Sequence, residues 1–171
     1  MAEIGIYGGS FNPIHFGHVG LAEWIVGHTD VDEVWLMVSP NNPLKDPNIL
    51  ADEQVRLAQV RQAIVGKKGL VASDFEFYLP RPSYTANTLR ALTKAYPEHR
   101  FSLIIGEDNL SIFDRWREYE YILANYRLLV YPRRGCQTDH IPYHGDIHVL
   151  RDAPYFDISS TEIRNNLQVR K

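Results

Sequence analysis

The stretch Ile4-Gly5-Ile6-Tyr7-Gly8-Gly9-Ser10-Phe11-Asn12-Pro13-Ile14-His15-Phe16-Gly17-His18 decides the fold. Its first four residues are prone to form a strand, which the adjacent glycines Gly8 and Gly9 are expected to end abruptly. Because glycine has no Cβ, the backbone there can turn sharply and let a bulky anion approach its amides. Beyond Pro13 the chain reads as a helix, whose N-terminal amides and dipole favour negative charge. The stretch therefore predicts a strand, an anion-binding loop and a helix.

Two histidines, His15 and His18, stand at the start of the expected helix. A spacing of three residues places both side chains on one helix face. The chain has neither the Gly-Lys-Ser/Thr end of a Walker loop nor the G-x-G-x-x-G pattern of a dinucleotide fingerprint here. The histidines must therefore make the contacts that a Walker lysine would make, and we expect the loop to hold the triphosphate of a nucleotide. A surface pair of histidines is the alternative.

The composition indicates one globular domain of 171 residues, with 44% hydrophobic and 23% charged residues. The net charge of −3 gives no electrostatic reason to propose a nucleic-acid or membrane partner. No apolar run approaches the roughly 18 residues of a membrane span, and no basic stretch followed by an apolar one opens the chain. The single cysteine, Cys136, fits a reducing compartment. We expect a cytoplasmic protein, and the sequence leaves its oligomeric state open.

Strand patterns alternate with helix patterns along the rest of the chain. Strands are expected at 33–38, 70–72, 101–105, 128–130 and 147–150. Helices are expected at 52–65 with Asp52 as N-cap, from Ser83 as N-cap to 96, at 116–123, and from 159. Alternating strands and helices imply right-handed βαβ units. The expected fold is therefore α/β, a doubly wound and mainly parallel sheet in a single domain spanning 1–171.

Ligands of such sheets collect outside the carboxyl ends of the strands, where the strand order reverses. The segments that follow the expected strands should face this crevice, and they are 8–18, 39–45, 83–85, 106–108 and 133–134. They carry small residues, hydroxyls, basic groups and carboxylate. This mixture suits a nucleotide or phosphate better than an apolar ligand.

A second motif lies near the end of the chain, at Asp157-Ile158-Ser159-Ser160-Thr161-Glu162-Ile163-Arg164. Its simplest interpretation is a capping box, in which Ser159 caps a helix and the glutamate three residues later reaches back. That interpretation leaves Ser160, Thr161 and Arg164 without a role. We therefore also expect the hydroxyls and free amides of this helix start, with Arg164 one turn on, to grip phosphates opposite the histidine loop.

Both motifs resemble signatures of the nucleotidylyltransferase superfamily. His15-Phe16-Gly17-His18 resembles its His-x-Gly-His signature, and the segment from Ile158 to Arg164 resembles its Ile-Ser-Ser-Thr-x-x-Arg signature. Between them, 82–89, 104–108, Phe113-x-x-Trp116 and Arg133 are similar to the bacterial nicotinate-nucleotide adenylyltransferases of NAD synthesis. The resemblance covers Ile4 to about Leu167. It implies a Rossmann-like domain that transfers AMP from ATP to nicotinate mononucleotide, giving nicotinate adenine dinucleotide and pyrophosphate.

The resemblance also implies roles for individual residues. The catalytic residues would be His15, His18 and Arg164. ATP would contact Gly8, Gly9, Ser10, Phe11, Gly17, Gly106, Asp108, Arg133, Ile158, Ser159, Ser160 and Thr161. Nicotinate mononucleotide would contact Lys45, Tyr84, Thr85, Trp116 and Arg117, its ring against Trp116 and its carboxylate on backbone amides near Thr85 and at Arg117. The cofactor would be Mg²⁺, held mainly by substrate phosphates and water.

The sequence departs from the family pattern at two places. The loop that usually carries Pro-Pro-His-Lys reads Asn42-Pro43-Leu44-Lys45, which keeps the lysine and loses the histidine. Asn12 stands where many relatives have aspartate.

Three alternatives stay open. One is a sister adenylyltransferase that uses nicotinamide mononucleotide or phosphopantetheine, and another is a nucleotide-binding module without turnover. The third is a metal site, because His140, His144 and His148 recur every four residues. Pro142 and Gly145 make a helix there unfavourable, which argues for a solvated loop.

Overall fold

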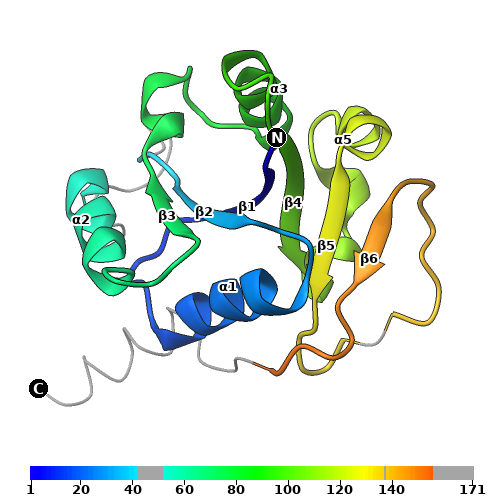
Figure 1. Cartoon of the computed structure of the whole chain (residues 1–171). Coiled ribbons are helices and arrows are strands. Elements are labelled where there is room, and N and C mark those ends of the chain that lie inside the picture. The colour runs from blue at the N-terminus through cyan, green and yellow to red at the C-terminus, as the bar shows by residue number, and fades with distance from the viewer. Residues whose placement is uncertain (42–51, 137, 156–171) are drawn as a thin grey trace, which may run out of the picture.

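In the computed structural model, which describes residues 1–41, 52–136 and 138–155, six strands form one sheet (Figure 1). In chain order they are β1 (Glu3–Gly9), β2 (Glu33–Val38), β3 (Leu70–Ser73), β4 (Arg100–Gly106), β5 (Arg127–Tyr131) and β6 (Ile147–Val149). Their order across the sheet is β3-β2-β1-β4-β5-β6, and each neighbouring pair is parallel. The expected doubly wound sheet is confirmed, and its strand order reverses between β1 and β4.

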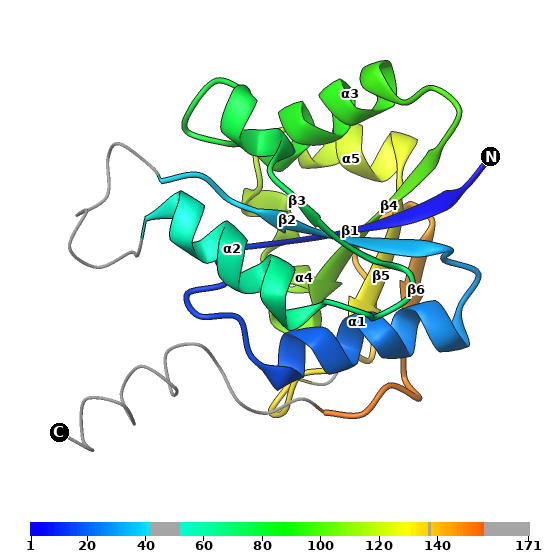
Figure 2. The same cartoon turned by 60° about the vertical axis from the view of Figure 1, so that its left-hand side comes forward.

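Helices cover both faces of the sheet (Figure 2). One face carries α1 (Phe16–His28) and α2 (Glu53–Ala63), and the other carries α3 (Thr85–Ala95) and α5 (Tyr119–Asn125). The remaining helical turns are short: η1 (Phe75–Tyr78), α4 (Glu107–Leu110) and η2 (Phe113–Arg115). None of the helices within the described ranges is long and apolar enough to cross a bilayer.

An apolar cluster fills each space between sheet and helices. On the α3 face, Leu89 and Leu92 pack with alternate residues of β1 and β4, such as Ile6. On the opposite face, Ile25 of α1 and Leu57 of α2 pack with the other set. Burial on both faces explains why the strands read as nearly continuous apolar runs.

Strand β1 is longer than the sequence predicts. It continues through Gly8 and Gly9, which pair with Met37 and Val38 of β2, so the glycines do not end the strand. The parallel ladder outweighs the low strand propensity of glycine, and the chain turns at Phe11, whose φ is 48°. A Cβ on Gly9 would lie 3.3 Å from the Phe11 ring, whereas one on Gly8 would meet nothing within 4 Å. Gly9 thus makes room for the Phe11 ring.

Two helix starts differ in outcome. Asp52 is the N-cap of α2 as expected, and its Oδ1 accepts a hydrogen bond from the Gln54 amide at 2.8 Å. The expectation that Ser83 caps α3 is wrong, because the cap position falls on Tyr84. The Ser83 hydroxyl is buried and has no hydrogen-bond partner within the described residues.

The helix expected at 116–123 starts later than the sequence predicts, because it spans Tyr119–Asn125. Trp116 follows η2 in an extended conformation, with φ −74° and ψ 137°. Helix α5 starts only after Glu118, which adopts the left-handed conformation at φ 55°. This break frees the Trp116 side chain from a helix face. The helix expected from Ser159 lies outside the described residues.

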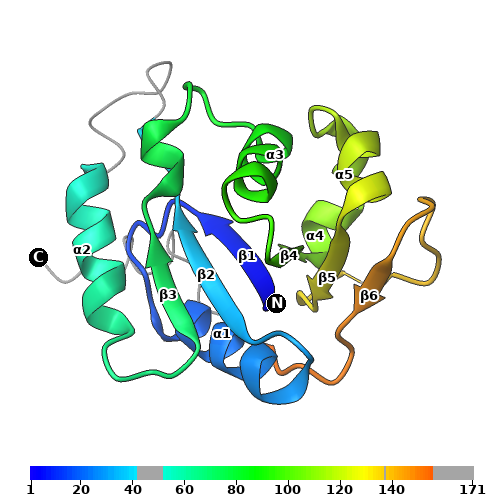
Figure 3. The ribbon, with the colours of Figure 1, turned by 45° about the horizontal axis from the view of Figure 1, so that its top comes forward.

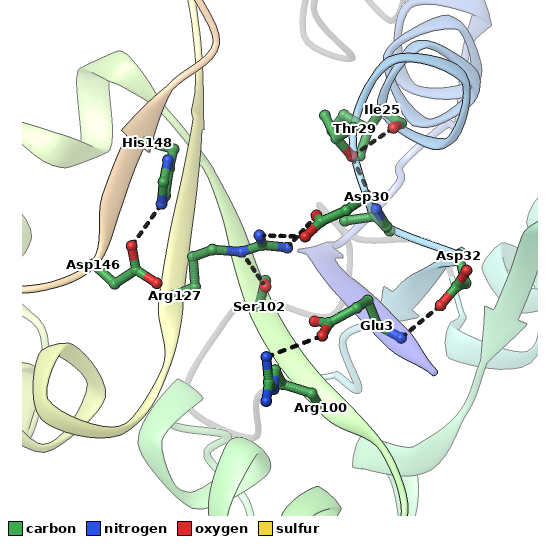
Figure 4. Close-up of polar contacts among 11 residues, drawn as sticks. Glu3, Ile25, Thr29, Asp30, Asp32, Arg100, Ser102, Arg127, Asp146 and His148 are labelled. Carbon is green, nitrogen blue, oxygen red and sulfur yellow. Dashed lines mark hydrogen bonds and ion pairs between the residues drawn. The ribbon is translucent and has the colours of Figure 1, made fainter. Parts of the chain in front are cut away.

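Ion pairs link residues at the edge of the sheet where the strands begin, which we call the amino edge (Figure 4). Arg127 of β5 donates two hydrogen bonds to Asp30, at 2.8 and 3.0 Å, and its Nε donates to the buried Ser102 hydroxyl at 2.9 Å. Arg100 of β4 pairs with Glu3 of β1 at 3.3 Å. The hydrogen bonds from Arg127 hold the pKa of Asp30 below its usual range.

Candidate active site

A cavity of about 220 Å³ opens at the carboxyl edge, between the ends of β1, β2 and β4. This is the point where the strand order reverses, as the sequence predicts. The predicted site residues in its wall are Gly8, Gly9, Thr85, Gly106 and Trp116. The structure therefore joins the glycine end of β1, the end of β4 and the start of α3 around one cavity.

His15 and His18 form the N-terminal cap of α1. His15 is the N-cap residue in extended backbone, and its Nδ1 accepts from the Gly17 amide at 3.1 Å. In return the His15 amide donates to Nδ1 of His18 at 3.2 Å. The expected shared helix face is wrong because His15 is not yet helical, but the two rings stack with centroids 3.7 Å apart. In this capping box, His15 replaces the usual Ser at the N-cap and His18 replaces the usual Glu three residues later. The spacing of the two histidines could therefore have predicted the cap.

The hydrogen bonds fix the tautomers of the two imidazoles. Because Nδ1 of His15 and of His18 accepts a backbone hydrogen bond, each neutral ring carries its proton on Nε2. Burial, together with the smaller effects of the His15 and Arg133 charges, lowers the pKa of His18 to about 3. His18 is therefore neutral near pH 7 and can donate a hydrogen bond from Nε2.

Aromatic rings hold His18 in place. The Phe11 ring meets its imidazole edge to face, with centroids 5.0 Å apart, and Tyr7 does so at 6.0 Å. Phe11 is 2% exposed, so the loop that carries Ser10 is anchored in the core at this residue. The buried Gly17 lies at the first turn of α1, next to the rings.

The end of β4 and the loop after β5 supply a second polar group. Arg133 Nε lies 3.8 Å from Asp108 Oδ1. Gly106 lets this carboxylate approach, because a Cβ there would lie 2.5 Å from Asp108 Oδ1 and 3.1 Å from the Tyr131 ring. The predicted residues Gly106, Asp108 and Arg133 are thus brought together.

The predicted acceptor residues also meet. The Arg117 guanidinium lies over the Tyr84 ring, 4.6 Å from its centroid. Trp116 packs beside Phe113, with centroids 5.0 Å apart, and lines the cavity with Thr85. An indole face and helix-start amides can bind a flat, polar ring.

Sequence reasoning missed a buried acid in the cavity wall. The Thr88 hydroxyl donates to Glu76 Oε2 at 2.7 Å, and both residues line the cavity. Burial raises the pKa of Glu76. The sequence gives no signal for this burial, because acidic side chains are mostly exposed.

Several predicted residues lie outside the described part of the chain, so their roles stay predictions. They are Lys45, Ile158, Ser159, Ser160, Thr161 and Arg164. One of the three histidines considered as a metal site, His148, is hydrogen-bonded to Asp146. Over residues 1–41, 52–136 and 138–155, no three His, Cys, Asp or Glu side chains group in a way that could hold a metal ion.

Known proteins are similar to this chain in sequence and in fold. Residues 6–166 match the cytidylyltransferase-like family. A Bacteroides fragilis protein named "Probable nicotinate-nucleotide adenylyltransferase" is 49% identical over 169 residues, covering 99% of this chain and 84% of that protein. A Flavobacterium johnsoniae protein of the same name is 46% identical over 171 residues, covering 99% and 88%.

A solved structure of similar fold is the Plasmodium falciparum nicotinic acid mononucleotide adenylyltransferase complexed with NaAD. It superposes with a TM-score of 0.80 at 21% identity, over 96% of this chain and 83% of that one. The fold, the histidine cap at the reversal point and these relatives agree. The chain belongs to the cytidylyltransferase-like family and, within it, to the nicotinate-nucleotide adenylyltransferases.

Proposed function

We propose that this protein transfers AMP from ATP to nicotinate mononucleotide, giving nicotinate adenine dinucleotide and pyrophosphate in NAD biosynthesis. The observation that carries the proposal is the cavity that joins β1, whose loop leads to the histidine cap, with the Thr85 and Trp116 wall. A triphosphate and a flat acceptor ring bound on these two sides would bring their phosphates together. The names of the relatives support the same pair of substrates. The single free cysteine, Cys136, suits a cytoplasmic location.

The reaction needs no nucleophilic side chain. An ionised phosphate oxygen of the mononucleotide attacks the α-phosphorus of ATP, a new P–O bond forms, and the bond to the β-phosphate oxygen breaks in line. Pyrophosphate leaves with the electron pair of that bond. Catalysis then consists of positioning and of stabilising charge on the transferring group.

His18 would supply the donor for that charge. The helix cap uses Nδ1 of His18, which accepts the hydrogen bond from the His15 amide. The cap therefore does not use Nε2–H. A triphosphate oxygen beside the ring would accept a hydrogen bond from Nε2–H of the neutral imidazole, and the cap bond to Nδ1 would be kept. Positive charge would come from Arg133 and, in the segments outside the described residues, from Lys45 and Arg164.

Mg²⁺ would enter as part of the MgATP substrate. Among the residues that the structure describes, the groups found around His18 are the aromatic rings of Tyr7 and Phe11, the His15 imidazole and the Arg133 guanidinium. None of these is the hard oxygen ligand that Mg²⁺ prefers, so the ion would be held by phosphate oxygens and water. Bound in this way, it neutralises phosphate charge.

One assay tests the proposal and its alternatives. Purified protein with ATP and Mg²⁺ is given nicotinate mononucleotide, nicotinamide mononucleotide or phosphopantetheine, and pyrophosphate release is followed. We expect the largest kcat/KM with the nicotinate acceptor. ATP binding without pyrophosphate release on any acceptor would overturn the proposal in favour of a nucleotide-binding module.

A further inference from the structure

Arg56 of α2 is completely buried behind the loops of the carboxyl edge. Its Nη1 donates to the Ser10 carbonyl at 2.7 Å and to the Ser39 carbonyl at 2.8 Å. Its Nη2 donates to the Asn41 side-chain oxygen at 2.7 Å. Ser10 follows β1, and Ser39 and Asn41 follow β2. One guanidinium therefore ties the loops that leave two neighbouring strands.

The contact with Ser10 acts on the strained part of the histidine loop. Phe11, the next residue, has a φ of 48°, which costs a residue with a side chain roughly 1 kcal/mol or more. Such a conformation persists only where its surroundings hold it. The Phe11 ring is fixed in the core, and Arg56 fixes the carbonyl of the peptide bond that precedes Phe11. Because that peptide is planar, its N–H points away from Arg56.

The tie extends to the acceptor side of the cavity through Glu53, one turn earlier on α2. Glu53 accepts two hydrogen bonds from Arg81, at 2.6 and 2.8 Å, and one from the Asn41 amide at 3.1 Å. Arg81 stands just before the segment 82–85, which contributes Ser83 and Thr85 to the cavity wall. The first turns of α2 thus contact the loops on both sides of the cavity.

An apolar side chain could fill the space at position 56, but it would leave the Ser10 and Ser39 carbonyls without this donor. The helix already buries Leu57 and Val60, and a buried guanidinium must recover its lost hydration through hydrogen bonds. Only a planar fork reaches three oxygens from three residues at fixed angles. Packing alone does not explain why a charge is placed here.

We propose that Arg56 is a positioning residue, which holds the loop after β1 in the conformation that binds the triphosphate of ATP. This inference rests on the proposed function for the identity of the nucleotide. Arg56 acts through Ser10 and Phe11, and it touches no substrate. Removing its fork lets the strained loop relax and weakens the binding of ATP.

The test measures binding of ATP alone by calorimetry, without an acceptor, for wild type, Arg56→Met and Arg56→Lys. We expect the Kd for ATP to rise about 10-fold to 100-fold in Arg56→Met. Arg56→Lys keeps the charge and most of the packing but loses the fork. It should recover most of the Tm and only part of the affinity. If Arg56→Met does not fold, Arg56→Lys alone decides.

The matched control is Arg127→Met, which removes an arginine that is likewise held by hydrogen bonds, at the opposite edge of the same sheet (Figure 4). It should lower the Tm and leave the Kd for ATP within twofold of wild type. The inference is overturned if Arg56→Met and Arg56→Lys bind ATP within twofold of wild type. It is equally overturned if Arg127→Met weakens ATP as much as Arg56→Met does.

The design separates this inference from the proposed function. If wild type binds ATP but releases no pyrophosphate with any acceptor, the proposed function fails and the binding series still tests Arg56. If pyrophosphate is released with nicotinate mononucleotide but the Arg56 variants bind ATP normally, the function stands and the positioning role fails.

Discussion

The parallel sheet has an amino edge and a carboxyl edge, formed by the two ends of the strands drawn in Figure 3. Polar groups are arranged in opposite ways at these two edges. At the amino edge, Arg127 and Asp30 meet in a bidentate pair, and the Nε–H of Arg127 is donated to Ser102. At the carboxyl edge, burial depresses the pKa of the His18 imidazole, and the Ser83 hydroxyl is buried without a partner among the described residues.

This difference separates stability from function within one sheet. Charges at the amino edge are paired within the protein, so they stabilise the folded chain without a ligand. At the carboxyl edge, the left-handed Phe11 and the desolvated His18 cost free energy, which suits groups that a ligand is meant to satisfy. Changes at the two edges should therefore affect different measurements.

The largest expected effect is on catalysis, from His18→Ala. Losing one donor to the transferring phosphate typically lowers the rate about 10²-fold to 10³-fold. We expect kcat to fall by this factor while far-ultraviolet circular dichroism stays native. His28→Ala, which removes the exposed histidine at the other end of α1, is the control and should keep normal kcat. Near-normal turnover of His18→Ala would remove the histidine cap from the mechanism.

The converse change breaks the amino edge. Arg127→Met leaves Ser102 buried without its donor and Asp30 without its pair, which should cost about 2–3 kcal/mol of unfolding free energy. Asp30 is partly exposed, so the upper end of the range for buried pairs is not expected. Urea denaturation gives the stability, and kcat/KM at 25 °C should match wild type. A tenfold loss of kcat/KM in a folded Arg127→Met would show that the edges are not separate.

Acid unfolding should separate the two edges by pH. The pKa of His18 is about 3 in the folded chain and about 6.5 when unfolded, so the unfolded chain takes up the proton first. Its contribution is complete above pH 6.5 and is lost as the pH falls from 6.5 toward 3, by about 2 kcal/mol at pH 5. Asp30 has a lowered pKa, so its contribution is lost only below about pH 4.

Urea denaturation of wild type and His18→Asn between pH 7 and pH 5 isolates the histidine from every other titrating group. The stability of His18→Asn should change less over this range, by about 2 kcal/mol. Parallel curves for the two proteins would show that His18 is not desolvated in the folded chain.

The sequence predicts the architecture well because the information is local and repeated. Runs such as 33–38 and 101–105 are apolar throughout, which a strand covered on both faces requires. The parallel, doubly wound arrangement and the position of the cavity then follow from general rules for βαβ units. The described parts of the expected segments after the strands lie at one edge of the sheet.

Errors arose where contacts between distant residues decide local conformation. The pairing of Gly8 with Met37 keeps β1 extended, although glycine reads as a strand end. The sequence gives no sign of the contacts of Arg56, because the acceptors described for it lie 15 to 46 residues away along the chain. Such contacts carry no local sequence pattern. The His15 cap differs from them, because its ring accepts the amide of Gly17, only two residues on, and the spacing of the two histidines is a local signal.

The smallest expected effect concerns the choice between nicotinate and nicotinamide mononucleotide. It tests how the side of the cavity formed by Thr85 and Trp116 binds the acceptor. Trp116 can stack on either ring, so Trp116→Ala should lower kcat/KM for both acceptors about tenfold. Sorting must come from donors near the carboxylate, which the resemblance places at the amides near Thr85 and at Arg117. A backbone amide N–H can donate a hydrogen bond to the carboxylate of the nicotinate ligand. With the neutral nicotinamide ligand, the same N–H either faces an N–H of the carboxamide or requires the carboxamide to rotate.

The ratio of kcat/KM for acid over amide should therefore stay within about threefold of wild type in Trp116→Ala. The Arg117 side chain lies over Tyr84, and its backbone is the expected donor, so Arg117→Tyr should also keep the ratio. Its kcat/KM for each acceptor then reports only the loss of the guanidinium contact with Tyr84. A ratio that collapses toward one in Arg117→Tyr would assign the sorting to the guanidinium, because a cation favours the carboxylate through space. A wild-type ratio near one would overturn the acid preference itself.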